Sequence, residues 1–131
     1  MKLLLDTYIW IWSSLEPHRV TSQVAREIAN PEHDRFLSPI SIWEMVMLLE
    51  RKRIRLDKDF GEWFLQSKQD LNLFEAPLTW EVAHELQFTM LGYRDPGDRF
   101  LVATAKAFDL TLVTADERLI HVPGLSVLPN R

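Results

Sequence analysis

The feature that most restricts the fold is a continuous apolar run at residues 3–5, Leu-Leu-Leu, which stops at Asp6. Strands that are buried on both faces of a sheet have this composition, and they belong to parallel sheets. A helical pattern at residues 8–14 follows directly. The start of the chain therefore predicts a central parallel strand that leads into a helix, with a carboxylate at the junction.

Strand and helix patterns alternate along the rest of the chain. Strands are predicted at residues 35–37, 73–76 and 110–113, with an edge strand at 125–128. Helices are predicted at residues 20–30, 39–53, 58–71 and 79–91, from 95 onward, and as a short turn after 114–117. This alternation predicts an α/β fold with helices on both faces of a mainly parallel sheet of four to five strands. The length of 131 residues suits a single domain over residues 1–131.

Composition excludes several kinds of protein. The 19 Asp and Glu outnumber the 15 Lys and Arg, and a formal net charge of −4 argues against a broad basic surface for nucleic acid. The absence of cysteine excludes disulfides, thiolate metal sites and a cysteine nucleophile, and it favours a reducing cytoplasm. Because Asp6 interrupts the apolar start and no small-residue cleavage site follows, we expect neither a signal peptide nor a membrane span.

Two acids follow strands that we expect to be central. Asp6 comes directly after the first strand, and Asp116 comes three residues after the strand at 110–113. Ligands of open parallel sheets bind beyond the carboxyl ends of the strands, and both acids lie at this edge. The alternative is that both are helix caps, with Thr114 and Glu117 forming a capping box beside Asp116.

Two further acids lie on inward faces of predicted helices. The neighbours of Glu44 at helical spacing are mainly apolar, and Asp98 shares a stripe with Leu101 and Val102. An isolated buried carboxylate must shift its pKa, pair with a cation or bind a metal. An arginine partner for Glu44 is the alternative there, and a helix-capping role beside the N-cap Asp95 is the alternative for Asp98.

A divalent cation would relieve the repulsion among these four acids. With no cysteine and no histidine cluster the ligands are all oxygen, which suits Mg²⁺ or Mn²⁺ better than zinc. Such sites commonly hydrolyse phosphodiesters without a covalent nucleophile. Thr7 and Thr114 are placed to orient a carboxylate, although both also fit helix caps.

Three segments together resemble a known family: LLLDTYIWIW, LSPISIWEMVMLLERKRIRL and YRDPGDRFLVATAKAFDLTLVTAD. They are similar to PIN-domain ribonucleases of the VapC toxin type, from bacterial toxin–antitoxin pairs, and the resemblance extends from Met1 to about Leu128. It implies a PIN-like domain whose metal-binding and catalytic acids are Asp6, Glu44, Asp98 and Asp116.

The resemblance also assigns supporting positions and one departure. Thr114 and Asp95 match supporting positions of the family pattern, and Arg99 is expected beside the site, facing an acid or a phosphate. Gly97 departs from the pattern, because relatives usually have a bulky apolar residue there. That difference affects the turn into the helix and leaves the four acids intact.

The same resemblance implies partners: an RNA substrate, Mg²⁺ or Mn²⁺, a second copy of the chain in a homodimer, and a cognate antitoxin that covers a groove beside the acids. Large apolar residues, among them Trp10, Trp12, Trp43, Trp63 and Phe64, exceed the need of a small core and could form that groove or the dimer face. We expect at least three of the five tryptophans to be largely buried.

Other functions fit less well. A haloacid dehalogenase phosphatase needs a second Asp two residues after Asp6, where this chain has Tyr8, and a receiver domain needs paired acids and a lysine that are not evident. A catalytically inactive PIN-fold interaction module and another metal-dependent phosphohydrolase remain alternatives. Without the four acids, 15 acidic residues face 15 basic ones, so RNA contacts would depend on single residues: Arg94, Arg99, Lys52 or Arg53.

Overall fold

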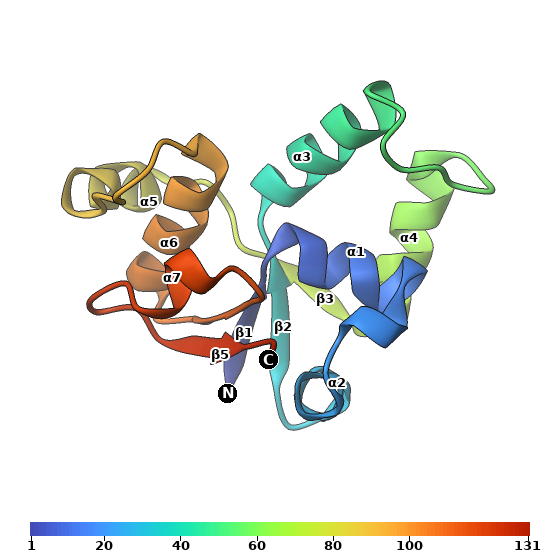
Figure 1. Cartoon of the computed structure of the whole chain (residues 1–131), viewed down its shortest axis with the longest axis horizontal. Coiled ribbons are helices and arrows are strands. Elements are labelled where there is room, and N and C mark those ends of the chain that lie inside the picture. Colours follow the sequence, from blue (N-terminus) through green and yellow to red (C-terminus); the bar gives the residue numbers. More distant parts are fainter.

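A five-stranded parallel sheet forms the centre of the computed structural model, which describes all 131 residues (Figure 1). Its strands are β1 (Lys2–Leu5), β2 (Asp34–Leu37), β3 (Leu73–Glu75), β4 (Thr111–Thr114) and β5 (Val127–Pro129). Their order across the sheet is β3-β2-β1-β4-β5, and every neighbouring pair is parallel. The predicted α/β fold with a parallel sheet is confirmed, and β1 is its central strand.

Helices connect the strands. They are α1 (Thr7–Leu15), η1 (Pro17–Arg19), α2 (Ser22–Ala29), α3 (Pro39–Glu50), α4 (Phe60–Leu71), α5 (Trp80–Glu85), η2 (Leu86–Phe88), α6 (Pro96–Phe108) and α7 (Glu117–Ile120). Side chains cap α3 and α6 as their sequences predict: Ser38 accepts from the Ile40 N–H, and Asp95 accepts from the Asp98 N–H.

Two helices are shorter than predicted. Of the helix expected at 79–91, the α-helical part ends at Glu85, and a 3₁₀ turn continues to Phe88. The Thr89 hydroxyl then donates to the Glu85 carbonyl. The helix expected to reach Arg53 ends at Glu50, and Lys52 adopts a positive φ of 56° that turns the chain away. In both places, side-chain and backbone geometry beyond the helical pattern decides where the helix ends.

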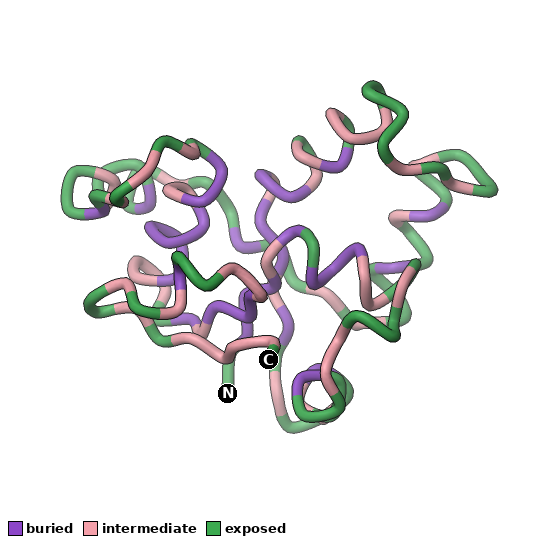
Figure 2. Tube along the Cα trace, in the orientation of Figure 1, coloured by how far each residue is buried: buried purple, intermediate pink, exposed green.

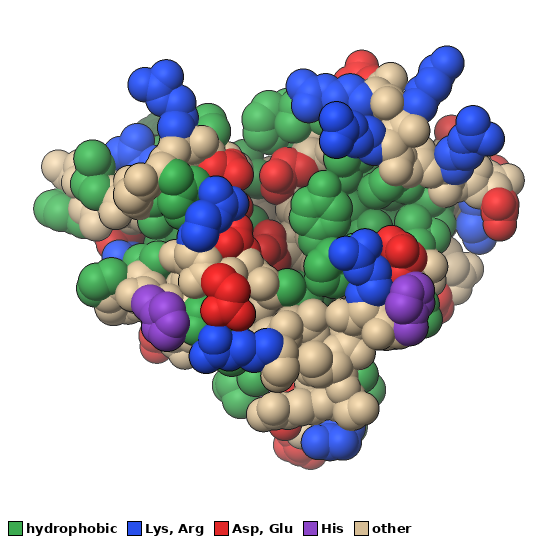
Figure 3. Space-filling model, in the orientation of Figure 1, with side chains coloured by type: hydrophobic (Ala, Val, Ile, Leu, Met, Phe, Trp, Pro, Cys, Tyr) green, Lys and Arg blue, Asp and Glu red, His purple; other side chains and the backbone are tan.

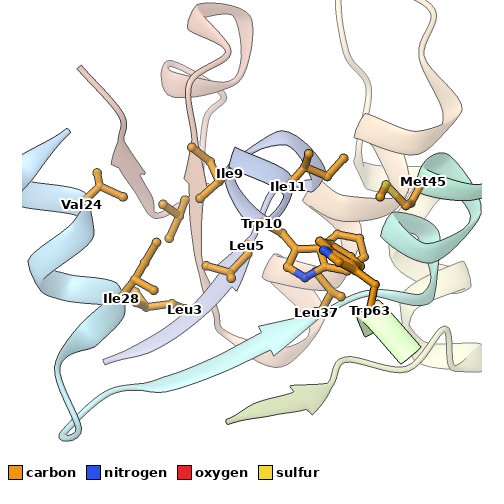
Figure 4. Close-up of a cluster of buried hydrophobic side chains, with 11 residues drawn as sticks. Leu3, Leu5, Ile9, Trp10, Ile11, Val24, Ile28, Leu37, Met45 and Trp63 are labelled. Carbon is orange, nitrogen blue, oxygen red and sulfur yellow. The ribbon is translucent and has the colours of Figure 1, made fainter. Parts of the chain in front are cut away.

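The alternating side chains of β1 divide the core into two parts. Leu3 and Leu5 face a cluster that includes Trp10 of α1 and Trp63 of α4 (Figure 4), whereas Leu4 faces a second cluster under α6. All three leucines are fully buried, and the buried segments gather at the centre of the molecule (Figure 2). The apolar run at residues 3–5 is thus explained by helices on both faces of the sheet.

The prediction that at least three tryptophans are largely buried is wrong. Trp10 and Trp63 are buried, Trp12 is half-buried, and Trp43 and Trp80 are exposed, with 94% of Trp80 accessible to solvent. Trp80 is the first residue of α5, where its side chain points outward from the helix start. No helix is both long and apolar enough to span a membrane.

The register of the central strands determines where the site lies. Leu5 of β1 is paired with Val113 of β4, and the Asp6 N–H donates to the Val113 carbonyl over 3.0 Å. Asp6 and Thr114 therefore leave the sheet side by side at its carboxyl edge.

Candidate functional site

Acidic side chains surround a hollow of about 260 Å³ at the carboxyl edge of the sheet. Figure 3 shows Asp and Glu side chains gathered in this depression, between the α6–α7 side of the molecule and the α1–α3 side. The lining includes Asp95 and Thr7. It also includes all four acids predicted from the sequence: Asp6, Glu44, Asp98 and Asp116. The fold thus brings together acids that are far apart in the sequence.

Asp6 caps helix α1 and is fixed by two hydrogen bonds. Its Oδ1 accepts from the Thr7 N–H over 2.8 Å, and its Oδ2 accepts from the Thr114 hydroxyl over 2.6 Å. Burial raises the pKa of Asp6 to about 6 against the lowering effect of these donors, and the charges of Glu44 and Asp116 raise it further. A partly buried cap beside two other acids has an unfavourable charge that a cation would relieve.

Glu44 projects from α3 toward α1. The Thr7 hydroxyl donates to Glu44 Oε1 over 2.6 Å, and because its one proton is used there, the Ser41 hydroxyl 2.8 Å away is the donor to Thr7. Burial raises the pKa of Glu44, and the charges of Asp95 and Asp98 add to the effect. No arginine or lysine forms an ion pair with Glu44, so the alternative of a paired core glutamate is wrong.

Asp98 lies in the first turn of α6, behind its N-cap Asp95. Its backbone N–H donates to Asp95 Oδ1 over 3.1 Å, and its Oδ2 accepts from the Tyr93 hydroxyl over 2.7 Å. The residue is buried, and this burial raises its pKa to about 6 although Tyr93 lowers it. Tyr93, which the sequence analysis did not identify, therefore orients one of the predicted acids.

Asp116 differs from the other three acids because a cationic side chain hydrogen-bonds both of its carboxylate oxygens. It caps α7, and Arg118 donates to it through its backbone N–H, Nε and Nη2 at distances of 2.9, 3.1 and 2.8 Å. These hydrogen bonds hold the pKa of Asp116 below its usual value. Arg118 was not predicted as a site residue, because its side chain reaches back to the acid two residues earlier, a contact that no helical or strand pattern marks.

Gly97 explains how Glu44 approaches helix α6. A Cβ atom at position 97 would lie 3.0 Å from Glu44 Oε2 and 3.2 Å from Glu44 Cδ. Only a hydrogen fits between the helix and this carboxylate without a shift. The residue that departs from the family pattern is therefore in direct contact with a predicted ligand.

Arg99 turns away from the acids. Its Nε donates to the Thr89 carbonyl over 2.9 Å, and its Nη2 donates to the Leu86 carbonyl over 2.8 Å. Arg99 forms no ion pair with an acid, so its side chain braces the segment after α5. Thr7, Thr114 and Asp95, in contrast, each hydrogen-bond a site acid or its backbone.

The donor chemistry of the hollow fits a hard divalent cation, because carboxylate and hydroxyl oxygens line it and no histidine does. In the arrangement seen, however, no three acidic or histidine side chains are close enough to share one ion. Binding an ion with several protein ligands therefore requires side chains to move, and Asp116, held by Arg118, is the most restrained of them.

A family model described as PIN domain matches residues 3–125 of the chain. Ribonuclease VapC22 of Mycobacterium tuberculosis is 30% identical to it over 118 residues, which cover 89% of this chain and 88% of the relative. Among solved structures, VapBC2 from Rickettsia felis bound to a promoter DNA fragment matches with a TM-score of 0.70 and 16% identity, covering 98% of both chains. A toxin–antitoxin complex from Klebsiella pneumoniae matches with a TM-score of 0.64 and 21% identity, again over 98% of both chains.

Proposed function

The chain belongs to the PIN-domain family, and we propose that it is a metal-dependent ribonuclease, the toxin of a toxin–antitoxin pair, with its active site in the acidic hollow. The curated relative that carries the name ribonuclease supports the activity. The observation that carries the proposal is the meeting of Asp6, Glu44, Asp98 and Asp116 in one hollow at the carboxyl edge of the sheet.

Each predicted ligand has a neighbour that holds it. Thr114 orients Asp6, Thr7 orients Glu44 and Tyr93 orients Asp98, each through a hydroxyl donated to one carboxylate oxygen. The remaining oxygens of these acids are free of side-chain donors and would ligate Mg²⁺ or Mn²⁺. When bound, the ion would orient and acidify a water molecule and offset the charge that develops on the phosphate.

The rim of the hollow suits a macromolecular partner. Tyr8 and Trp12 line it, with ring centroids 5.7 Å apart, and Tyr8 is half exposed. We assign RNA as the substrate and a cognate antitoxin as the protein that covers this aromatic rim. We further propose that the chain forms a homodimer in the cytoplasm. The structural neighbours described as toxin–antitoxin complexes support the antitoxin as a partner.

Cleavage of RNA tests the activity. Purified protein is incubated with total RNA in millimolar Mn²⁺ or in EDTA, and the cut ends are mapped by sequencing. We expect defined cuts in Mn²⁺ and none in EDTA. Asp98→Asn should abolish them, whereas Asp109→Asn should not.

Asp109 is a matched control because it ends the same helix at a φ of 55°, a conformation that asparagine tolerates. If the wild-type protein makes no cuts in Mn²⁺, the chain is an inactive interaction module or acts on another phosphate ester. Cuts that survive in Asp98→Asn would instead exclude this acid from the mechanism.

A further inference from the structure

Arg118 is the one basic residue whose side chain contacts the acids of the hollow. Its Nε and Nη2 donate to separate oxygens of Asp116 over 3.1 and 2.8 Å. Nη2 also lies 3.8 Å from Asp98 Oδ2. Both carboxylate oxygens of a predicted metal ligand are therefore engaged by the protein itself.

The Arg118 guanidinium donates hydrogen bonds to one residue and stacks on another. The Arg118 side chain is 56% exposed, and all its side-chain hydrogen bonds go to Asp116. Its other face lies on the Tyr93 ring, with Cζ 3.9 Å from the ring centroid. Because Tyr93 is anchored to Asp98 through its hydroxyl, the guanidinium can rotate over a fixed aromatic surface without leaving the rim.

A divalent ion and the guanidinium compete for the same acid. Two cations at ligand distance from one carboxylate repel each other strongly in a partly buried hollow. The four predicted ligands reach no shared ion position in the arrangement seen, in which Arg118 occupies Asp116. If Arg118 released Asp116, this acid could bind a metal ion together with the other predicted ligands. The N–H donors of the Arg118 guanidinium would then face the solvent.

We propose that Arg118 exchanges partners during the reaction, binding Asp116 in the free protein and a phosphate of the RNA once a metal ion occupies the acids. This inference rests on the proposed ribonuclease function. A guanidinium is suited to both partners, because its planar fork matches the two oxygens of a carboxylate or of a phosphate. Tyr93 keeps the fork at the rim in both states.

The exchange predicts opposite effects of one substitution on two ligands. In Arg118→Gln, the Kd for Mn²⁺ measured by titration calorimetry should fall about threefold to fivefold, because the competitor is gone. At saturating Mn²⁺, kcat/KM for a synthetic RNA with a mapped cut site should fall about tenfold or more, because the phosphate contact is lost.

Arg131→Gln is the matched control. Arg131 is similarly exposed and pairs with Glu117, the neighbour of Asp116, without contacting the hollow. It removes the same charge, and both quantities should change by less than about twofold. Arg118→Lys keeps the charge without the fork, and its kcat/KM should lie between those of the wild type and Arg118→Gln.

Each outcome has one meaning. Mn²⁺ binding in Arg118→Gln that is unchanged or weaker overturns the exchange, as does a loss of kcat/KM no larger than in Arg131→Gln. If melting in EDTA shows that Arg118→Gln does not fold, Arg118→Lys takes its place in the Mn²⁺ titration with the same expected direction. A wild-type protein that cuts no RNA contradicts the proposed function instead, while the Mn²⁺ titration still reports whether Arg118 competes for Asp116.

Discussion

The Thr114 hydroxyl lies 2.6 Å from Asp6 Oδ2 and joins residues that are 108 positions apart in the chain. The same hydroxyl accepts from the Asp116 N–H over 3.0 Å. One side chain at the end of β4 therefore positions two acids, the one that follows β1 and the one that caps α7. This double contact is possible because β1 and β4 are neighbours that end in register.

Thr114→Val should remove this link. The variant keeps the shape of the side chain but leaves Asp6 Oδ2 without its donor, so we expect a loss of about 1–2 kcal/mol in the free energy of unfolding and weaker Mn²⁺ binding. Thr111→Val is the control, because Thr111 lies on the same strand and contacts the Ser126 hydroxyl at the surface. Urea denaturation and Mn²⁺ titration compare the two, and equal losses would show that Thr114 has no particular role at the acids.

Asp98→Asn, which should abolish RNA cleavage, should make the metal-free protein more stable. The buried carboxylate is repelled by Asp95, Asp6 and Asp116, whereas an asparagine oxygen can still accept from Tyr93. In EDTA at pH 7.5 we expect the variant to be more stable than the wild type, by about 1 kcal/mol after solvent screening. A clear drop in its melting temperature would mean that the charge of Asp98 stabilises the fold.

The metal-free protein should become more stable as the pH falls from 7.5 to 5. Asp6 and Asp98 have pKa values of about 6 in the folded protein, above the ordinary value of 3.8 that applies when the chain is unfolded. The folded state therefore binds these protons more tightly, so stability rises as the pH falls through about 6. Asp116, with its lowered pKa, opposes this only below its ordinary value of 3.8.

Melting curves in EDTA at several pH values measure this effect, and we expect an increase of a few degrees at pH 5. The double variant Asp6→Asn, Asp98→Asn should show a flatter profile. Millimolar Mn²⁺ at pH 7.5 should also raise the melting temperature of the wild type, since the ion binds only the native site. A wild-type profile that falls between pH 7.5 and 5 contradicts the pKa assignment.

Gly97→Ala should weaken metal binding more than stability. The added methyl group would lie 3.0 Å from Glu44 Oε2, and the carboxylate must move by a few tenths of an ångström to accommodate it. The strain is offset in part by the better helix propensity of alanine, by about 0.5–1 kcal/mol. We expect a melting temperature close to that of the wild type and a Kd for Mn²⁺ that is several-fold higher.

Gly92→Ala is the control for this change, since a Cβ at position 92 would have no atom within 4 Å. If both glycine variants bind Mn²⁺ as the wild type does, Glu44 does not depend on the space at Gly97.

Much of the fold could be predicted because it depends on local patterns. The apolar run at residues 3–5 predicts a central strand, and helical spacing places Glu44 and Asp98 on inward faces, which is where the structure has them. The position of Asp6 and Asp116 at the carboxyl edge of the sheet follows from the same alternation of elements. Assignment of these acids as metal ligands remains a prediction.

The contacts of long polar side chains could not be predicted in this way. The family resemblance placed Arg99 beside the acids, but its guanidinium donates to the carbonyls of Leu86 and Thr89, in the turn after α5. Arg118 and Tyr93 reach the acids through side-chain rotation and loop path, neither of which leaves a periodic pattern. Trp80 is exposed at the start of α5, because no neighbouring element covers it there. Its residue type alone does not reveal this.

The division of the core by β1 means that the acids of the site lie on helices that pack into different hydrophobic clusters. Asp6 caps α1, which packs into the cluster of Leu3 and Leu5, and Glu44 lies on α3, which contributes Met45 to that cluster and Ile40 to the cluster of Leu4. Asp98 lies on α6, over the cluster of Leu4. A cation held by acids from both sides would link α1 and α3 to α6 through a second connection, in addition to the contacts that α3 and α6 already make. Binding of the cation would then slow the exchange of amide hydrogens with solvent in α3 and α6, and its loss would speed this exchange.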